Sequence, residues 1–142
     1  MPEFREVLER ALPYCDVLFG NEAEAWAYAE AVGWETRDVE FIATRLSLVP
    51  MASKKAPRKV VITRGKEPTV LAVRGVTSQH GVVPVERVVD TAGYGDAFVG
   101  GFLAALARRH ALPACCQAGS YAAAAVLQQA GCSWPEKPEY CL

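Results

Sequence analysis

The sequence is poor in the residues that build metal centres. It has two histidines, His80 and His110, and five cysteines, and no two cysteines form a CxxC pair. Structural zinc sites need four such ligands at close and regular spacings, so we predict no zinc centre. An odd number of cysteines without a disulfide pattern is typical of a reducing compartment. We therefore expect a cytoplasmic protein, and we leave the nucleus open as a second compartment.

The chain also lacks an excess of either charge and a long apolar run. Fifteen Lys and Arg against sixteen Asp and Glu leave a formal net charge of −1. Proteins that bind nucleic acid or anionic membranes usually carry a basic surplus. The uncharged run at 97–107 is too short for a bilayer, and the run at 111–135 is interrupted by polar residues and prolines. We therefore expect neither nucleic acid nor a membrane as a partner.

Half of the residues are apolar, which is enough for the core of one domain. β-branched apolar runs predict strands at 15–19, 59–63, 69–73 and 81–89, the last irregular or at an edge because of Pro84. Helical spacing predicts helices at 4–12, 21–32, 39–48, 96–109 and 113–130. Asn21 and Thr36 are the expected caps of the second and third helices, and the basic residues 54–59 are expected to form an exposed loop. This alternation indicates an α/β fold with a partly parallel sheet.

Two glycine-containing stretches come close to known nucleotide-binding motifs. The segment GYGDAF begins like a dinucleotide fingerprint, but Phe98 stands where Gly or Ala is needed. The pair Gly65-Lys66 has no Ser or Thr after it and no upstream glycine, so it is not a Walker phosphate loop. We therefore predict neither a dinucleotide site of the Rossmann type nor a P-loop.

A lone carboxylate, Asp96, stands between a glycine-rich turn and an apolar helix. The amides of Gly93, Tyr94, Gly95 and Asp96 would lie at a helix N-terminus, where free N–H groups and a partial positive charge favour phosphate. An aspartate is ordinarily ionised at neutral pH and could accept a proton from a hydroxyl group that attacks phosphorus. The same residues equally suit a simple helix cap that needs no ligand. Spacing alone leaves both interpretations open.

Asn21 and Glu24 have the spacing of a capping box. An asparagine at the N-cap accepts from the third helical amide, and the glutamate three residues later accepts from the N-cap amide. Taken alone, this pair is typical of a helix start rather than of a ligand site.

Four stretches together resemble the PfkB carbohydrate-kinase (ribokinase-like) family. DTAGYGDAFVGGF at 90–102 is similar to the second signature of the family, and PYCDVLFGNEAEA at 13–25 is similar to its NxxE segment. VVITRG at 60–65 resembles the strand that leads to the nucleotide. GCSWPEKP at 131–138 resembles the C-terminal tail of the members that phosphorylate adenosine. The order and spacing of the stretches match across nearly the whole chain.

The resemblance implies a ribokinase-like α/β/α sandwich, of which residues 1–142 would be a single-domain, C-terminal, nucleotide-binding part. The N-terminal half, with the acceptor pocket and lid, would be absent. The implied reaction moves the γ-phosphoryl group of ATP to the 5′-hydroxyl of adenosine, with Mg²⁺, in purine salvage. The alternatives are another nucleoside or a sugar as acceptor, and a non-catalytic ATP-binding fragment or degenerate paralogue. We expect a monomer when the protein is complete, and self-association of the fragment.

The resemblance also implies roles for individual residues. Asp96 would be the catalytic base, and the amides of Gly93, Tyr94, Gly95 and Asp96 would form the anion hole. Asn21 and Glu24 would organise Mg²⁺ through water.

Further residues would contact ATP. Thr63, Arg64 and Gly65 would lie at its phosphates, and Ala118 and Ala122 would lie near its adenine. Alanines at the last two positions equally suit close packing of a helix.

Two positions depart from the pattern of the family. Tyr94 stands in the anion-hole turn where a small residue is usual, and Ala92 replaces an asparagine that is often found there. A phenol at Tyr94 would either crowd a phosphate or cover the site.

Overall fold

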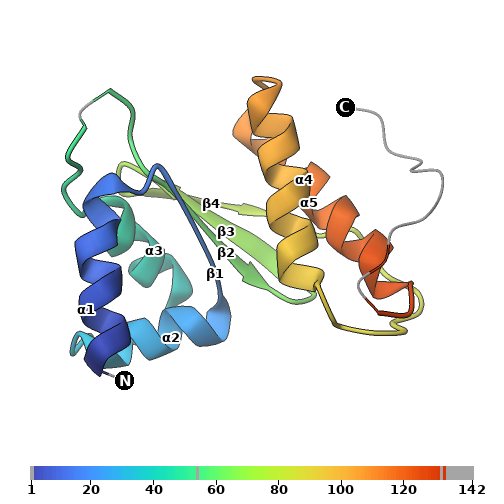
Figure 1. Cartoon of the computed structure of the whole chain (residues 1–142), viewed down its shortest axis with the longest axis horizontal. Coiled ribbons are helices and arrows are strands. Elements are labelled where there is room, and N and C mark those ends of the chain that lie inside the picture. Colours follow the sequence, from blue (N-terminus) through green and yellow to red (C-terminus); the bar gives the residue numbers. More distant parts are fainter. Residues whose placement is uncertain (1, 54, 132, 134–142) are drawn as a thin grey trace. The chain divides into compact units, whose positions relative to one another are not determined.

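The computed structural model describes residues 2–53, 55–131 and 133. The chain divides into two compact units, residues 1–79 and residues 80–142 (Figure 1). The expectation of a single domain over 1–142 stays a prediction. Within the described ranges, no helix combines the length and the apolar character needed to cross a bilayer.

The first unit is a mixed sheet with helices on one face. Its elements are α1 (Pro2–Ala11), a 3-10 turn (Leu12–Tyr14), β1 (Val17–Asn21), α2 (Glu22–Ala31), α3 (Val39–Ser47), β2 (Lys59–Arg64), β3 (Glu67–Val73) and β4 (Val76–His80). The strand order is β1-β2-β3-β4. β1 runs parallel to β2, and β2 runs antiparallel to β3, so the prediction of a partly parallel sheet is confirmed.

One core holds this unit together. Val60 and Ile62 of β2 are at most 2% exposed, and they cluster with Ala29 of α2 and Ile42 of α3. Leu12, which follows α1, belongs to the same cluster. Because β2 residues at alternate positions point to one face, α1, α2 and α3 must cover that same face of the sheet. Burying each large aliphatic side chain of this kind contributes about 1.5–3 kcal/mol.

Two-residue loops set the register of the antiparallel strands. Gly65 has φ of 61° at the first position of the β2–β3 loop. Arg74 and Gly75 have φ of 51° and 77° in the β3–β4 loop. Loops with positive φ match the twist of the flanking strands, and positive φ at both residues is typical of a type I′ turn. The Gly75 amide donates to the Ser47 hydroxyl at 2.9 Å, which ties the second loop to the end of α3.

The prediction of a strand at 81–89 is wrong. That segment has no regular secondary structure, and the additional strand is β4, at Val76–His80. The Val83 amide donates to the Ser120 hydroxyl at 2.6 Å, and the Val89 amide donates to the Leu127 carbonyl at 2.7 Å. The backbone of 81–89 therefore bonds in part to α5 (Leu112–Leu127) rather than to a strand ladder.

Two smaller predictions in the first unit are also corrected. Asp38, not Thr36, caps α3, because its carboxylate accepts from the amides of Glu40 and Phe41. Thr36 instead accepts from the Asp38 amide at 3.1 Å and fixes the approach to the cap. The loop predicted to be exposed at 54–59 contains Arg58, which is fully buried.

The second unit consists mainly of two closely packed helices, α4 (Tyr94–Ala107) and α5. Figure 1 shows them side by side. Phe98 and Phe102 of α4 are buried, and their rings stack at 6.4 Å. Cys116 of α5 is also buried, and burial raises the pKa of its thiol to about 12. Since the thiolate is the reactive form, Cys116 is inert at neutral pH.

Gly101 makes the close approach of α4 and α5 possible. A Cβ added at Gly101 would lie 2.5 Å from the Ala118 carbonyl oxygen and 2.9 Å from the Ala122 Cβ. Backbone atoms cannot move aside cheaply, so we expect Gly101→Ala to lower the free energy of unfolding by about 1–3 kcal/mol. Urea denaturation followed by circular dichroism measures this change.

Gly100 is the matched control for this prediction. A Cβ there meets nothing within 4 Å, so Gly100→Ala should stabilise the helix by about 0.5–1 kcal/mol. Equal effects of the two substitutions would contradict the packing explanation.

Candidate functional site

The turn before α4 is held in place by Asp90. Its carboxylate accepts from the Ala92 amide at 2.9 Å and from the Gly131 amide at 3.1 Å. Gly93 then has φ of 76°, in the left-handed region that favours glycine, and α4 begins at Tyr94. No role for Asp90 was predicted from the sequence. An aspartate two residues before the amide that it binds is the signal of an Asx turn, and it could have indicated this one.

The first turn of α4 keeps amide groups available. The Ala97 amide donates to the Gly93 carbonyl at 2.8 Å, and the Tyr94 amide makes a long bond of 3.4 Å to the Thr91 carbonyl. The amides of Gly95 and Asp96 make no hydrogen bond to any residue that the structure describes. A Cβ at Gly95 would meet nothing within 4 Å. These N–H groups, at the positive end of a helix dipole, can therefore receive an anion.

Asp96 lies in the same turn, in the first residues of α4. Its side chain is exposed and, within the described ranges, makes no hydrogen bond or ion pair. The carboxylate is therefore not used as a helix cap, which was the simpler interpretation of the sequence. Tyr94 beside it is partly buried, and burial raises the pKa of its phenol, so the phenol stays protonated at neutral pH.

Asn21 and Glu24 form the capping box that their spacing predicts. The Asn21 amide donates to Glu24 Oε2, and the Glu24 amide donates to Asn21 Oδ1, both at 2.8 Å. The bond to Asn21 uses one carboxylate oxygen, and Glu24 is exposed. No group of three or more His, Cys, Asp or Glu that could hold a metal occurs in the described part of the chain. Mg²⁺ keeps several water ligands, and the role of this pair in organising it through water stays a prediction.

Thr63 lies beside this capping box, and Arg64 and Gly65 follow it in the chain. Thr63 is the register partner of Asn21 in the parallel pair of β1 and β2. Both strands therefore end at the same edge of the sheet, where ligands of open α/β sheets usually bind. Arg64 donates from Nε to the Pro68 carbonyl at 2.8 Å and from Nη2 to Gln79 at 3.4 Å. The structure thus brings Thr63 next to Asn21, whereas the Arg64 guanidinium is bonded to β3 and β4.

Ala118 and Ala122 lie on α5 at the contact with Gly101. Each is 4% exposed, so both alanines pack helix against helix. Close helix packing was one of the two interpretations that the sequence left open for these alanines. Their contact with the adenine of ATP stays a prediction, as do the roles of the other site residues.

The chain matches the family model of the pfkB family carbohydrate kinases over residues 1–138, and it belongs to that family. It is 47% identical over 139 residues to adenosine kinase 1 of Arabidopsis thaliana, covering 96% of this chain and 40% of that protein. The structure of Anopheles gambiae adenosine kinase in complex with P1,P4-di(adenosine-5) tetraphosphate is similar, with a TM-score of 0.87 and 38% identity. That comparison covers 96% of this chain and 42% of the other.

Adenosine kinase from Schistosoma mansoni in complex with adenosine and AMP is similar with a TM-score of 0.85 and 32% identity, covering 98% of this chain and 43% of that one. These likenesses confirm the prediction of a partial ribokinase-like α/β fold. The chain spans about 40% of the length of the first curated relatives that it matches.

Proposed function

We propose that this chain supplies the phosphate-binding and proton-accepting part of an adenosine kinase. The reaction transfers the γ-phosphoryl group of ATP to the 5′-hydroxyl of adenosine and yields AMP and ADP. The observation that carries the proposal is the start of α4, where the Gly95 and Asp96 amides and the Asp96 carboxylate are all unbonded among the described residues. The similar adenosine kinases support adenosine as the acceptor.

In this reaction Asp96 accepts the proton of the attacking hydroxyl group. General-base catalysis of this kind contributes about 10²–10⁴ in rate. The amides of the first α4 turn stabilise the charge on the transferred phosphoryl oxygens, and each such donor is worth roughly 3–4 kcal/mol. The Asp96 carboxylate and these amides belong to the same first turn of α4, so the distance between them is set before the substrate binds.

Thr63, Arg64 and Gly65 contact the ATP phosphates in this proposal. Asn21 and Glu24 hold the waters of Mg²⁺, which when bound supplies positive charge to the phosphates. Adenosine phosphorylation of this type belongs to purine salvage, and we place it in the cytoplasm.

Glu24→Gln separates the metal role from the capping role. Glutamine also serves in a capping box, so the free energy of unfolding should stay within about 0.5 kcal/mol. The lost charge should raise the Mg²⁺ concentration at half-maximal activity several-fold in a protein completed by the remainder of a relative. Thermal unfolding and a Mg²⁺ titration of activity measure the two effects. If the Mg²⁺ dependence of activity did not change, Glu24 would only cap α2 and would have no role in organising Mg²⁺.

The general test is binding followed by turnover. Calorimetry with ATP·Mg²⁺ on the 142-residue chain measures the nucleotide site, and phosphorylation of adenosine by the completed protein measures the reaction. Binding without turnover in the completed protein would favour the alternative of a non-catalytic ATP-binding paralogue, which the unusual Tyr94 in the turn supports. If the completed protein phosphorylated another nucleoside or a sugar faster than adenosine, that compound would replace adenosine as the proposed acceptor.

A further inference from the structure

A row of large side chains along one side of α3 is open to solvent. Phe41, Arg45 and Leu48 follow one another at intervals of four and three residues, so they lie on the same side of the helix. Phe41 is 41% exposed and Leu48 is 59% exposed. Ile42 and Leu46, on the other side of α3, are buried in the core of the first unit. The helix therefore presents apolar side chains to the solvent as well as to the core.

Neighbouring segments lengthen this row at both ends. The Trp34 ring meets the Phe41 ring edge-on, with 6.4 Å between the ring centroids. A Cβ on Gly75 would lie 3.2 Å from the methyl carbons of Leu48, so the β3–β4 loop packs against that side chain. Val76, the first residue of β4, is 71% exposed. The continuous surface formed by these residues is called the α3 strip, and its members are Trp34, Phe41, Arg45, Leu48 and Val76.

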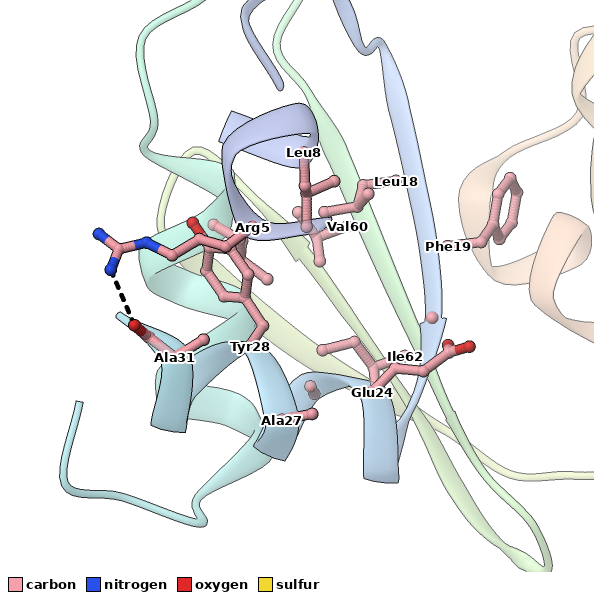
Figure 2. Close-up of a pocket in the computed structure, with 13 residues that line it drawn as sticks. Arg5, Leu8, Leu18, Phe19, Glu24, Ala27, Tyr28, Ala31, Val60 and Ile62 are labelled. Atoms are coloured by element: carbon pink, nitrogen blue, oxygen red, sulfur yellow. Dashed lines mark hydrogen bonds between the residues drawn. The ribbon is translucent and has the colours of Figure 1, made fainter. Parts of the chain in front are cut away.

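The aromatic part of the α3 strip is held in place by its own contacts. The Arg45 Cζ atom lies 5.3 Å from the centroid of the Trp34 ring and 5.2 Å from that of the Phe41 ring, which are cation–π distances. Tyr28 meets the Trp34 ring edge-on at 5.7 Å. Tyr28 itself lines a cavity of about 390 Å³ beside α1, α2 and the sheet (Figure 2). Because these side chains are already ordered, they lose little conformational entropy when a partner binds.

The positive charge at this surface is not paired with a carboxylate. Arg45 and Arg74, the latter in the β3–β4 loop, are exposed, and neither guanidinium makes an ion pair or a hydrogen bond with any residue that the structure describes. The two carboxylates at the start of α3 are used elsewhere. Asp38 caps the helix, and Glu40 accepts from the Gln79 side chain at 3.1 Å. The surface therefore combines exposed apolar side chains with two arginines that can each receive an anionic group.

We propose that the α3 strip docks an acidic, amphipathic segment of another protein. Continuous exposed apolar surface marks interaction sites, and tryptophan and arginine are enriched among the residues that dominate binding energy. Leucine or aromatic side chains of the partner pack on Phe41 and Leu48. Its carboxylates pair with Arg45 and Arg74, since a guanidinium binds a carboxylate through two parallel hydrogen bonds. None of these residues is part of the proposed phosphoryl-transfer site, so the inference is independent of that reaction.

A protein segment suits the α3 strip better than nucleic acid does. The formal net charge of the chain is −1, whereas surfaces that bind nucleic acid usually belong to basic domains. Leu48 and Val76, at one end of the strip, offer no aromatic plane on which a base could stack. Aliphatic side chains of a partner protein can pack on both residues.

The test selects peptides from a random-sequence library displayed on phage, with the full 142-residue chain as bait. Phage that also bind the variant Leu48→Asp are removed first. We expect the selected sequences to be rich in Asp and Glu, with Leu, Phe or Trp between them. Calorimetry with the synthetic peptide then measures the affinity. Leu48→Asp and Arg45→Gln should each weaken binding about tenfold or more, and added salt should weaken the wild-type complex by screening the ion pairs.

Val88→Asp and Arg108→Gln are the matched controls. Val88 is 55% exposed, Arg108 is also exposed, and both residues belong to the second unit. Each control makes the same chemical change as one of the two test variants, so it should leave the affinity within about twofold. All four substitutions replace exposed side chains, and thermal unfolding checks that each variant remains folded.

Each outcome decides the question. Acidic peptides whose affinity depends on both Leu48 and Arg45 would support the inference. A library that yields no such sequence, or peptides whose binding falls equally in the controls, would overturn it. A homodimer in size-exclusion chromatography that Leu48→Asp dissociates would overturn it in favour of a second copy of the chain. Binding of a single-stranded oligonucleotide that Arg45→Gln abolishes would overturn it in favour of nucleic acid.

Discussion

Replacing Asp96 with asparagine is expected to lower the turnover of the completed kinase about 10²-fold or more while leaving ATP binding unchanged. Asparagine keeps the size of the side chain but cannot accept the proton of the attacking hydroxyl group. The exposed Asp96 side chain makes no hydrogen bond with the described residues, so the substitution should not disturb the fold. Steady-state kinetics and calorimetry with ATP·Mg²⁺ measure the two effects.

Glu86→Gln is the control for this prediction. Glu86 is an exposed carboxylate in the same unit but outside the turn that begins α4. The control loses the same charge, so a comparable fall in turnover would reflect net charge rather than base catalysis. If Asp96→Asn kept nearly full turnover, Asp96 would not be the catalytic base. The amides of the turn would then be the only catalytic groups proposed for the start of α4.

The sequence predicted best where a local motif determines the structure. The Asn21 and Glu24 spacing predicted a capping box, and both of its hydrogen bonds are present. The glycines before Asp96 predicted a helix start with available amides, and α4 begins two residues earlier than expected, at Tyr94. These features are determined by residues that lie a few positions apart in the chain, so a local sequence pattern is enough to predict them.

Prediction failed where distant residues decide the outcome. Residues 81–89 look like a strand, but their amides bond to Ser120 and Leu127, which no local pattern indicates. β4 was missed because VTSQH has little apolar character, and the tight turn at Arg74 and Gly75 is what pairs it with β3.

Arg58 is the clearest case of a residue whose solvent exposure was predicted wrongly from the sequence. In a basic, proline-containing loop it looks solvated, yet it is fully buried. Its guanidinium donates to the carbonyls of Cys15 at 3.1 Å, Leu46 at 2.9 Å and Val49 at 2.9 Å, and also to the carbonyl of Leu12. Burial lowers the pKa of Arg58, but a guanidinium remains charged at neutral pH. One side chain thus joins the end of α1, the start of β1 and the end of α3.

Arg58→Met is therefore expected to lower the free energy of unfolding by roughly 3–5 kcal/mol, because several buried carbonyls lose their donor at once. Methionine fills part of the space but leaves buried carbonyls without donors, and each unsatisfied group costs about 1–3 kcal/mol. A loss of this size is a large fraction of the roughly 5–15 kcal/mol that stabilises an ordinary domain. Urea unfolding followed by circular dichroism measures it.

Arg10→Met provides the comparison, because Arg10 is exposed on α1 and the same chemical change there should cost less than about 1 kcal/mol. Arg58→Lys should fall between the two, since an ammonium group has three donors but lacks the planar fork that reaches carbonyls on several sides. If Arg58→Met proved as stable as Arg10→Met, water would have to replace the guanidinium at these carbonyls. The junction of α1, β1 and α3 would then owe its stability to the apolar core around Ile42 and Val60 alone.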